Sequence, residues 1–181
     1  MSCILIILCL ISGVFTQSWE PGKCPSIDVE PVDICRVSGR WFEYKKSFDV
    51  YDPEETCAEM FWNNTDTVGS QLIFTSIPKE TKNCLKIIAD ATLNDNSLFT
   101  DFHIPVSASV KIYTYILETD YNDYIIIWRC QNRGSMHAIT SWVKSRYAKP
   151  RIDIDKKVRE AFRKRGLKIV SFVKMDQENC P

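Results

Sequence analysis

The chain of 181 residues lacks most of the patterns that identify enzymes and nucleic-acid-binding proteins. Its 23 basic and 23 acidic residues balance, so it has no basic excess of the kind that a nucleic-acid-binding surface needs. It has no CxxC pair, no Cys/His cluster, no phosphate-binding glycine loop and no Ser-His-Asp order. These absences predict that the protein is not an enzyme, holds no metal ion and has no nucleic-acid partner.

Long hydrophobic runs are also missing. The longest run covers residues 4–15, which is too short for a bilayer span of ~20 apolar residues. Its length and the small or polar residues that follow are typical of a signal peptide, although no Lys or Arg precedes the run. We expect residues 1–18 to be a signal peptide and residues 19–181 a single domain, since no repeat or linker interrupts them. The product is therefore expected to be secreted and extracellular, without integral membrane contact.

The chain contains eight cysteines. Without Cys3 and Cys9 of the expected signal peptide, six remain: Cys24, Cys35, Cys57, Cys84, Cys130 and Cys180. An even number in a secreted chain predicts disulfides, but spacing alone does not choose among the possible pairings. The sequon Asn63-Asn64-Thr65 predicts N-glycosylation at Asn63.

Short apolar or alternating runs, separated by turn residues, fill the centre of the chain. They predict strands at residues 41–48, 57–62, 71–77, 84–93, 98–104, 109–117, 124–129 and 137–145. Eight strands at this regular spacing predict an antiparallel meander or barrel, and closure into a barrel would remove the exposed edges.

One helix is predicted after these strands. Asp153 suits its N-cap, Val158 and Phe162 form an i, i+4 apolar pair, and Gly166 suits the position after its C-cap. A short final strand is predicted at residues 168–172.

Three motifs in this order resemble the signatures of the lipocalin family, closest to its arthropod bilin-binding, insecticyanin and apolipoprotein D-like branch. They are Gly39-Arg40-Trp41, Thr119-Asp120-Tyr121 and Arg146. In that family the Trp plugs the closed end of the barrel, the Thr-Asp turn lies at the same end, and the Arg packs over the Trp. The resemblance covers residues 19–181. It implies an all-β, eight-stranded antiparallel up-and-down barrel with one C-terminal α-helix and a short final strand.

The resemblance also implies two disulfides, Cys24–Cys130 and Cys57–Cys180. Cys35 and Cys84 depart from the pattern of that branch. A Cys35–Cys84 bridge would have to join opposite ends of the barrel, so a free thiol and an intermolecular bridge are the alternatives.

Strand alternation and the family register together give the side chains expected to face the cavity and bind ligand. They are Met60, Trp62, Ile87, Ala89, Ile112, Thr114, Ile116, Ile125, Ile127, Arg129, Thr140 and Trp142. Each could equally be ordinary core packing. Arg129 could pair with a ligand carboxylate near an open mouth, or it could be a rim residue that reaches solvent.

The resemblance implies a carrier or sequestering protein for a small hydrophobic molecule such as a bilin, a carotenoid or a lipid. No cofactor is required, although bound biliverdin would suit the branch. One alternative is a lipocalin that binds or inhibits a protein through loops such as the acidic residues 49–55. Another is a haem carrier, which needs an inward histidine, and only His103 and His137 exist. The oligomeric state is left open.

Overall fold

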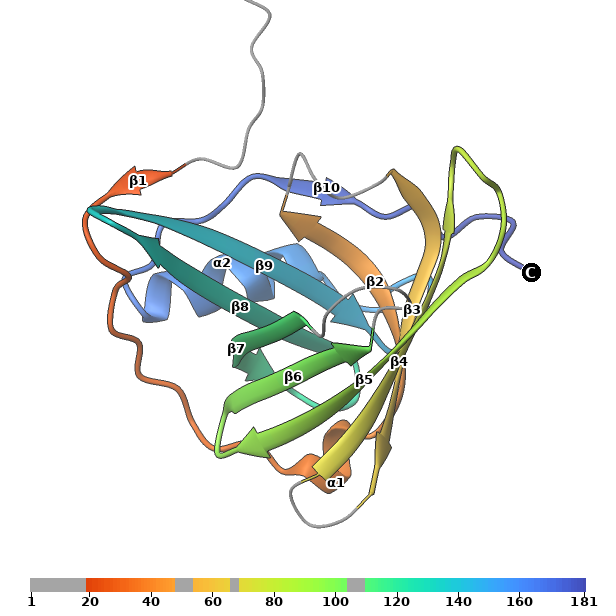
Figure 1. Cartoon of the computed structure of the whole chain (residues 1–181), viewed down its shortest axis with the longest axis horizontal. Helices are drawn as coiled ribbons and strands as arrows, with labels where there is room; N and C mark the ends of the chain where they lie inside the picture. Colours follow the sequence, from red (N-terminus) through yellow and green to blue (C-terminus); the bar gives the residue numbers. More distant parts are fainter. Residues whose placement is uncertain (1–18, 48–53, 66–68, 104–109) are drawn as a thin grey trace, which may run out of the picture.

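The computed structural model describes residues 19–47, 54–65, 69–103 and 110–181, and most of its regular structure is antiparallel β-sheet (Figure 1). Along the described residues the elements are β1 (Glu20–Pro21), α1 (Ile34–Val37), β2 (Gly39–Ser47), β3 (Glu55–Asn64), β4 (Gly69–Pro78), β5 (Leu85–Asn94), β6 (Ser97–His103), β7 (Val110–Thr119), β8 (Tyr124–Arg133), β9 (Met136–Ser145), α2 (Ile154–Lys164) and β10 (Phe172–Lys174). The signal peptide predicted at residues 1–18 lies outside these residues.

The sheet closes on itself because β2 pairs with β9. From β2 to β9 each strand pairs with the next in the chain, and all of these pairings are antiparallel. The closing register places Phe42 opposite Ser145 and Glu43 opposite Lys144. Closure gives each of the eight strands a partner on both edges. The predicted eight-stranded antiparallel barrel is therefore confirmed.

The final strand lies further along the chain than predicted. It was expected at residues 168–172, whereas β10 begins at Phe172, so the predicted position is wrong. The reason lies in β2, whose residues 39–42 pair with β3 and whose residues 45–47 pair with β10. Only the last part of β2 has an edge that β3 does not occupy, and that part fixes the place and the length of β10.

The barrel half nearest α1 is filled by side chains. Its hydrophobic cluster includes Val37, Trp41, Trp62, Ala89, Ile116 and Ile125, all of which are buried. Trp41 also donates a 2.7 Å hydrogen bond from Nε1 to the carbonyl of Val37, so the indole is fixed at the barrel floor. This end is therefore a packed core, and it closes the interior on one side.

Helix α2 covers the outer face of the barrel and lies behind β8 and β9 in Figure 1. The Asp153 side chain accepts a 2.9 Å hydrogen bond from the backbone N–H of Lys156, and Gly166 follows the helix with φ +62°. Val158 and Phe162 are buried, as their spacing predicted. They belong to a second cluster with outward side chains of β8 and β9, namely Ile126, Trp128 and Val143. The predicted helix is confirmed.

Two disulfides tie the terminal segments to the barrel. Cys24–Cys130 joins the N-terminal segment to β8, and Cys57–Cys180 joins β3 to the C-terminal segment. These are the pairs that the resemblance implied. Each closes a loop of more than 100 residues, an effect typically worth about 2–4 kcal/mol. Cys35 and Cys84 are exposed and unpaired, so the doubtful Cys35–Cys84 bridge is not formed.

The Thr119-Asp120-Tyr121 motif forms the turn between β7 and β8. The Asp120 Oδ1 atom accepts hydrogen bonds of 2.8–3.1 Å from the backbone N–H groups of Asn122, Asp123 and Tyr124. Thr119 Oγ1 accepts a hydrogen bond from the N–H of Tyr121, which holds Tyr121 at φ +68°. Side-chain acceptors of this kind replace the backbone pairing that a strand would supply, so the motif is structural.

Arg146 links this turn to the start of β2. Its guanidinium carbon lies 3.7 Å from the ring centroid of Trp41, as the resemblance implied. The guanidinium also donates four hydrogen bonds of 2.8–3.0 Å to backbone carbonyls, those of Arg36, Ser38, Arg40 and Tyr121. A Cβ atom on Gly39 would lie 3.3 Å from Arg146 Nη1, and Gly39 has φ +97°. Glycine at this position therefore gives the guanidinium room.

We predict that Arg146→Lys lowers the free energy of unfolding by about 2–4 kcal/mol, because an ammonium cannot reach four carbonyls or stack on the indole. Urea denaturation measures this change. The matched control is Arg151→Lys, which alters another guanidinium stacked on an aromatic ring, that of Tyr147, at a site where the Arg side chain is 60% exposed. The control should change stability by less than about 0.5 kcal/mol. Equal losses in both variants would contradict a special role for Arg146.

Candidate ligand-binding cavity

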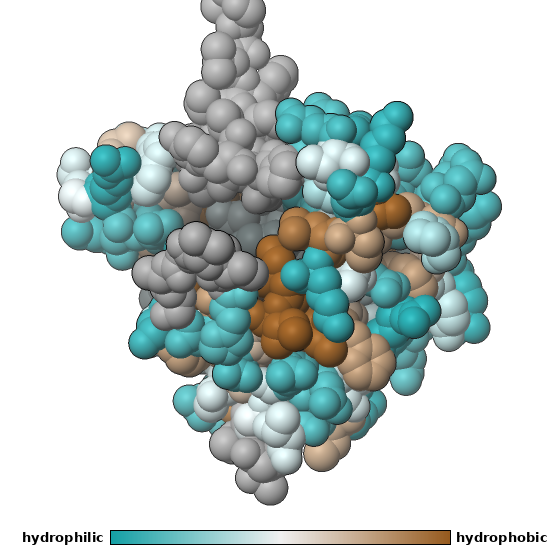
Figure 2. All heavy atoms as spheres, turned by 45° about the vertical axis from the view of Figure 1, so that its right-hand side comes forward, coloured by the Kyte–Doolittle hydropathy of each residue, from teal (hydrophilic) through white to brown (hydrophobic). Residues whose placement is uncertain are grey.

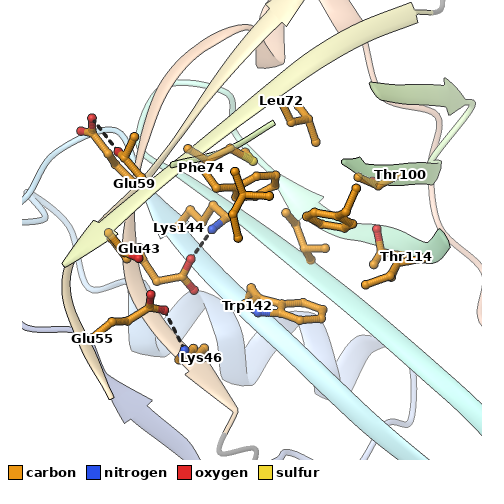
Figure 3. A pocket seen from close by; sticks show the side chains of 18 of the residues that line it. Glu43, Lys46, Glu55, Glu59, Leu72, Phe74, Thr100, Thr114, Trp142 and Lys144 are labelled. Atoms are coloured by element: carbon orange, nitrogen blue, oxygen red, sulfur yellow. Dashed lines mark hydrogen bonds and ion pairs between the residues drawn. The ribbon is translucent and has the colours of Figure 1, made fainter. Parts of the chain in front are cut away.

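A cavity of about 280 Å³ occupies the barrel interior beyond the packed half (Figure 3). This volume is near the lower end of the range for small-molecule sites, about 300–1,000 Å³. The apolar lining residues are Ala58, Met60, Leu72, Phe74, Leu85, Ile87, Leu98, Phe102, Ile112, Ile127 and Trp142. The polar and charged ones are Glu43, Lys46, Glu55, Glu59, Thr75, Ser76, Thr100, Thr114 and Lys144.

The structure places the predicted ligand-binding residues in three groups. Six line the cavity: Met60, Ile87, Ile112, Thr114, Ile127 and Trp142. Four are buried in the same hydrophobic cluster as Met60 and Ile127 but do not line the cavity: Trp62, Ala89, Ile116 and Ile125. Arg129 and Thr140 are not among the lining residues, and Arg129 Nη2 donates a 3.1 Å hydrogen bond to Gln131. Cavity and core thus divide the predicted set according to depth in the barrel.

A buried ion pair crosses the wall where the barrel closes. Glu43 and Lys144 are 4% and 5% exposed, and Glu43 Oε2 accepts a hydrogen bond from Lys144 Nζ. Figure 3 shows the two side chains pointing toward each other from β2 and β9. Burial raises the pKa of Glu43, and the charge of Lys144 acts in the opposite direction.

A second ion pair lies beside the first. Lys46 Nζ is 2.8 Å from Glu55 Oε1, and both side chains are largely buried. Glu59 lies on the same side of the cavity, where its carboxylate accepts a 3.3 Å hydrogen bond from Thr75 and is 3.6 Å from Arg40. The cavity is therefore apolar on most sides. Its charged wall consists of five residues from β2, β3 and β9: Glu43, Lys46, Glu55, Glu59 and Lys144.

Sequence reasoning missed these charged residues, although strand alternation contained the signal. Residues two apart on a strand share a face, so Glu43 follows Trp41 inward and Lys144 follows Trp142. Arg129 was the one charged residue that we predicted on the cavity face, and it is not among the lining residues. Charged side chains are rarely buried without a partner, and the partner here comes from a strand about a hundred residues away.

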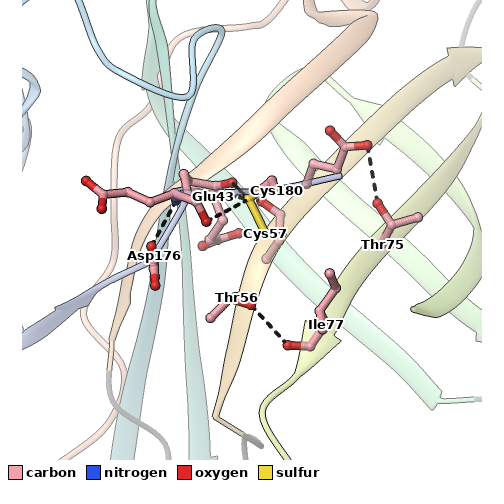
Figure 4. Close-up of a disulfide and its surroundings, with 11 residues drawn as sticks. Glu43, Thr56, Cys57, Thr75, Ile77, Asp176 and Cys180 are labelled. Carbon is pink, nitrogen blue, oxygen red and sulfur yellow. Dashed lines mark hydrogen bonds between the residues drawn. A yellow bond between two sulfur atoms is a disulfide. The ribbon is translucent and has the colours of Figure 1, made fainter. Parts of the chain in front are cut away.

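The C-terminal segment supports the charged wall from outside (Figure 4). Cys57 has φ +55° and lies in a register shift between β3 and β4, where its backbone N–H donates a 2.8 Å hydrogen bond to the carbonyl of Asp176. Gln177 Nε2 donates to the backbone carbonyls of Glu43 and Ala58 at 2.9 and 2.7 Å. The Cys57–Cys180 disulfide holds this segment in place, so it also fixes the backbone of two lining residues.

One lining residue is also strongly exposed. Leu85, at the start of β5, is 39% exposed, which places it at the rim of the cavity. Figure 2 shows hydrophobic side chains gathered in the middle of one face and bordered by hydrophilic ones. In this view the right-hand side of Figure 1, where β3, β4 and β5 lie, is turned forward.

Neither histidine of the chain lines the cavity. His103 Nε2 pairs with Asp90 at 2.8 Å and is exposed, and His137 Nδ1 lies 3.2 Å from the carbonyl of Gly22 on the outer face. The axial histidine that the haem-carrier alternative needs is therefore missing from the described part of the cavity wall. Among the described residues no group of three His, Cys, Asp or Glu side chains could hold a metal ion.

Asn63, the predicted glycosylation site, lies near the end of β3 with an exposed side chain. Of the acidic loop at residues 49–55, only residues 54 and 55 are described. No helix in the described ranges is long and apolar enough to cross a membrane.

We predict that Glu43→Leu alone costs about 3–5 kcal/mol, because it leaves the Lys144 ammonium buried without its partner. The double variant Glu43→Leu/Lys144→Met should regain most of this loss or exceed wild-type stability. A double-mutant cycle by chemical denaturation measures the coupling. The exposed pair Lys79–Glu54 is the control, with an expected coupling of less than about 1 kcal/mol. Additive losses at Glu43 and Lys144 would contradict a strong buried pair.

The raised pKa of Glu43 gives a prediction for pH. The folded state binds a proton at Glu43 more tightly than the unfolded state, whose carboxyl titrates near the ordinary value of 4.5. The stability from this proton is therefore present below pH 4.5 and is lost as the pH rises through the folded pKa. The unfolding free energy of the wild type minus that of Glu43→Gln should decrease as the pH rises from 4.5. A difference that stays flat or increases would contradict the raised pKa.

The sequence and the fold both match known proteins. The sequence matches the lipocalin / cytosolic fatty-acid binding protein family over residues 38–179. The Lazarillo protein of Schistocerca americana is 33% identical over 112 residues, which are 58% of this chain and 51% of that protein. The match thus spans about half the length of this relative.

Two solved structures have a similar fold. Insecticyanin from the tobacco hornworm Manduca sexta has a TM-score of 0.75 at 18% identity, over 89% of this chain and 89% of that chain. Lobster apocrustacyanin A1 has a TM-score of 0.72 at 23% identity, over 89% of this chain and 92% of that chain. At these identities the likeness shows the fold, and all three relatives are arthropod proteins, in agreement with the branch that the motifs resemble. The closed barrel, the Trp41–Arg146 stack and the family match over most of the sequence establish that the chain belongs to the lipocalin family.

Proposed function

We propose that the protein is a secreted carrier that sequesters a small hydrophobic molecule inside its barrel. The observation that supports this most directly is the largely apolar cavity of about 280 Å³ above a packed core. Members of the family are generally binding and transport proteins rather than enzymes. A cavity of this kind removes apolar ligand surface from water, which is worth roughly 25 cal/mol per Å² before the costs of binding are subtracted.

The ligand would contact the residues that line the cavity, above all Phe74 and the two predicted residues Ile127 and Trp142. Phe74 and Phe102 have ring centroids 5.4 Å apart, so they offer a preformed aromatic surface. The volume favours a compact ligand, or one that extends beyond Leu85 at the rim. A bilin or a carotenoid would need such an extension, whereas a medium-chain lipid would fit inside.

Secretion is part of the proposal. It depends on the apolar run at residues 4–15 and agrees with the two disulfides, which form and persist in oxidising compartments. N-glycosylation of Asn63 belongs to the same proposal and agrees with the exposed position of that side chain.

We predict that the protein, purified untagged from its natural fluid, carries a hydrophobic molecule in a 1:1 complex. Absorption spectroscopy and native mass spectrometry measure this. A visible band with a matching mass excess would identify a pigment, and a colourless mass excess would identify a lipid or a similar ligand. A bare mass, together with no binding of added hydrophobic ligands, would contradict the carrier function and favour a loop-mediated protein partner.

A cavity-filling variant links binding to the barrel interior. Thr100→Phe adds a ring at a buried lining position, so it should weaken binding of the hydrophobic dye Nile red by at least about tenfold. Thr92→Phe is the control, because Thr92 lies on β5 between the inward residues Ala91 and Leu93 and so faces outward. Equal affinities in both variants would place the dye outside the cavity.

A further inference from the structure

The buried carboxylate of Glu43 has one oxygen without a partner. Oε2 accepts a hydrogen bond from Lys144, whereas Oε1 is buried and has no hydrogen-bond partner. An unsatisfied buried polar group costs about 1–3 kcal/mol, and more when it is charged. An ionised carboxylate accepts up to about four hydrogen bonds, so Lys144 meets only part of its capacity.

Glu43 lies where a hydrogen-bond donor for its unpartnered oxygen could come from a ligand in the cavity. In the part of the chain that the structure describes, the buried side-chain atoms without a partner belong to Glu43, Asp101, Trp128 and Arg165. Among these residues, only Glu43 lines the cavity. The neighbouring ammonium of Lys46 is paired with Glu55, so it is already engaged. Oε1 itself is buried, but Glu43 lines the cavity, and rotation of its terminal torsion can turn either oxygen toward a donor there.

The charge of the lining restricts what that donor can be. Glu43, Glu55 and Glu59 oppose Lys46 and Lys144, and Arg40 lies 3.6 Å from Glu59, so the formal charges at this side of the cavity balance. A ligand carboxylate would add a second like charge beside Glu43 in a medium where repulsion is strong. A hydroxyl donates without adding charge, and an ammonium donates and is attracted to the Glu43 carboxylate.

We infer that the cavity selects an apolar ligand whose polar end is a hydrogen-bond donor, a hydroxyl or an amine, which binds the Glu43 carboxylate. This inference rests on the proposed carrier function and names the ligand class for the same cavity. The ligand's apolar body lies against Phe74, Ile127 and Trp142, and its donor lies at the charged wall between β2 and β9. Glu43 is then the residue that determines specificity.

A series of ten-carbon ligands that differ only at one end tests the inference. Decan-1-ol and decylamine donate, 1-methoxydecane cannot donate, and decanoate carries the disfavoured charge. Displacement of Nile red from the intact protein gives the four affinities. We expect decan-1-ol, decylamine or both to bind at least about tenfold more tightly than 1-methoxydecane, and decanoate to bind more weakly than decan-1-ol.

Two variants assign the preference to Glu43. In Glu43→Leu/Lys144→Met the preference for donors over 1-methoxydecane should fall to within about twofold, while 1-methoxydecane itself still binds. Glu118→Gln is the matched control. It neutralises a partly buried carboxylate of β7 that bonds to Tyr124 and is not among the lining residues, so the preference should remain. If the double variant does not fold, the four affinities of the wild type still test whether the cavity prefers donors.

The outcomes separate this inference from the carrier function. If all four ligands bind equally and Thr100→Phe weakens them all, the cavity binds ligands without discriminating donors from non-donors, and the inference fails. If decanoate binds most tightly, the lysines rather than Glu43 select the ligand, and the inference also fails. If none displaces Nile red, or Thr100→Phe has no effect, the carrier function fails first. Tight binding of decylamine alone narrows the class to amines, and tight binding of decan-1-ol alone narrows it to alcohols.

Discussion

The pairing of β2 with β9 is the constraint on which the remaining structure depends. It turns an eight-stranded meander into a barrel and thereby creates an interior. It also places Glu43 opposite Lys144 in the same register, so two charges that would be costly alone become partners. At the end of the same interface Arg146 leaves β9 and binds the backbone around Gly39, which seals one side. Closure, floor and charged wall are thus consequences of one strand pairing.

The charged wall is a costly feature for a protein interior. Desolvation of Glu43 and Lys144 offsets much of their attraction, and apolar residues of similar volume would often serve stability as well. Lys46 and Glu55 repeat the arrangement nearby, and the C-terminal segment fixes the backbone of Glu43 and Ala58 through Gln177. Under the proposed ligand class, these groups would serve recognition rather than packing alone.

The features shared with the family and the features of the cavity lie in different halves of the barrel. The packed half of the barrel, the turn at Asp120 and the stack on Trp41 belong to the fold and are compatible with many ligands. The half with the cavity combines aromatic and aliphatic side chains with the charged residues of β2, β3 and β9. The charged positions of β2, β3 and β9 line the cavity and are not among the residues of the packed cluster at the closed end.

The sequence by itself determined the eight antiparallel strands and α2, because strand alternation, regular turns and the cap residues of α2 are local signals that tertiary contacts did not override. The closed barrel was implied by the family resemblance, and the pairing of β2 with β9 decided it. Glycine at position 39 and the Thr119-Asp120 turn could likewise be predicted, since each answers a local backbone requirement. The place of β10 could not be predicted, because it depends on where β3 leaves the edge of β2. Tertiary structure alone also showed that Met60 and Ile127 line the cavity whereas Trp62 and Ile125 of the same buried cluster do not, since alternation gives the face of a residue but not its depth. It alone brought Glu43 to Lys144, because a buried charge becomes tolerable only through a partner supplied by strand pairing across about a hundred residues.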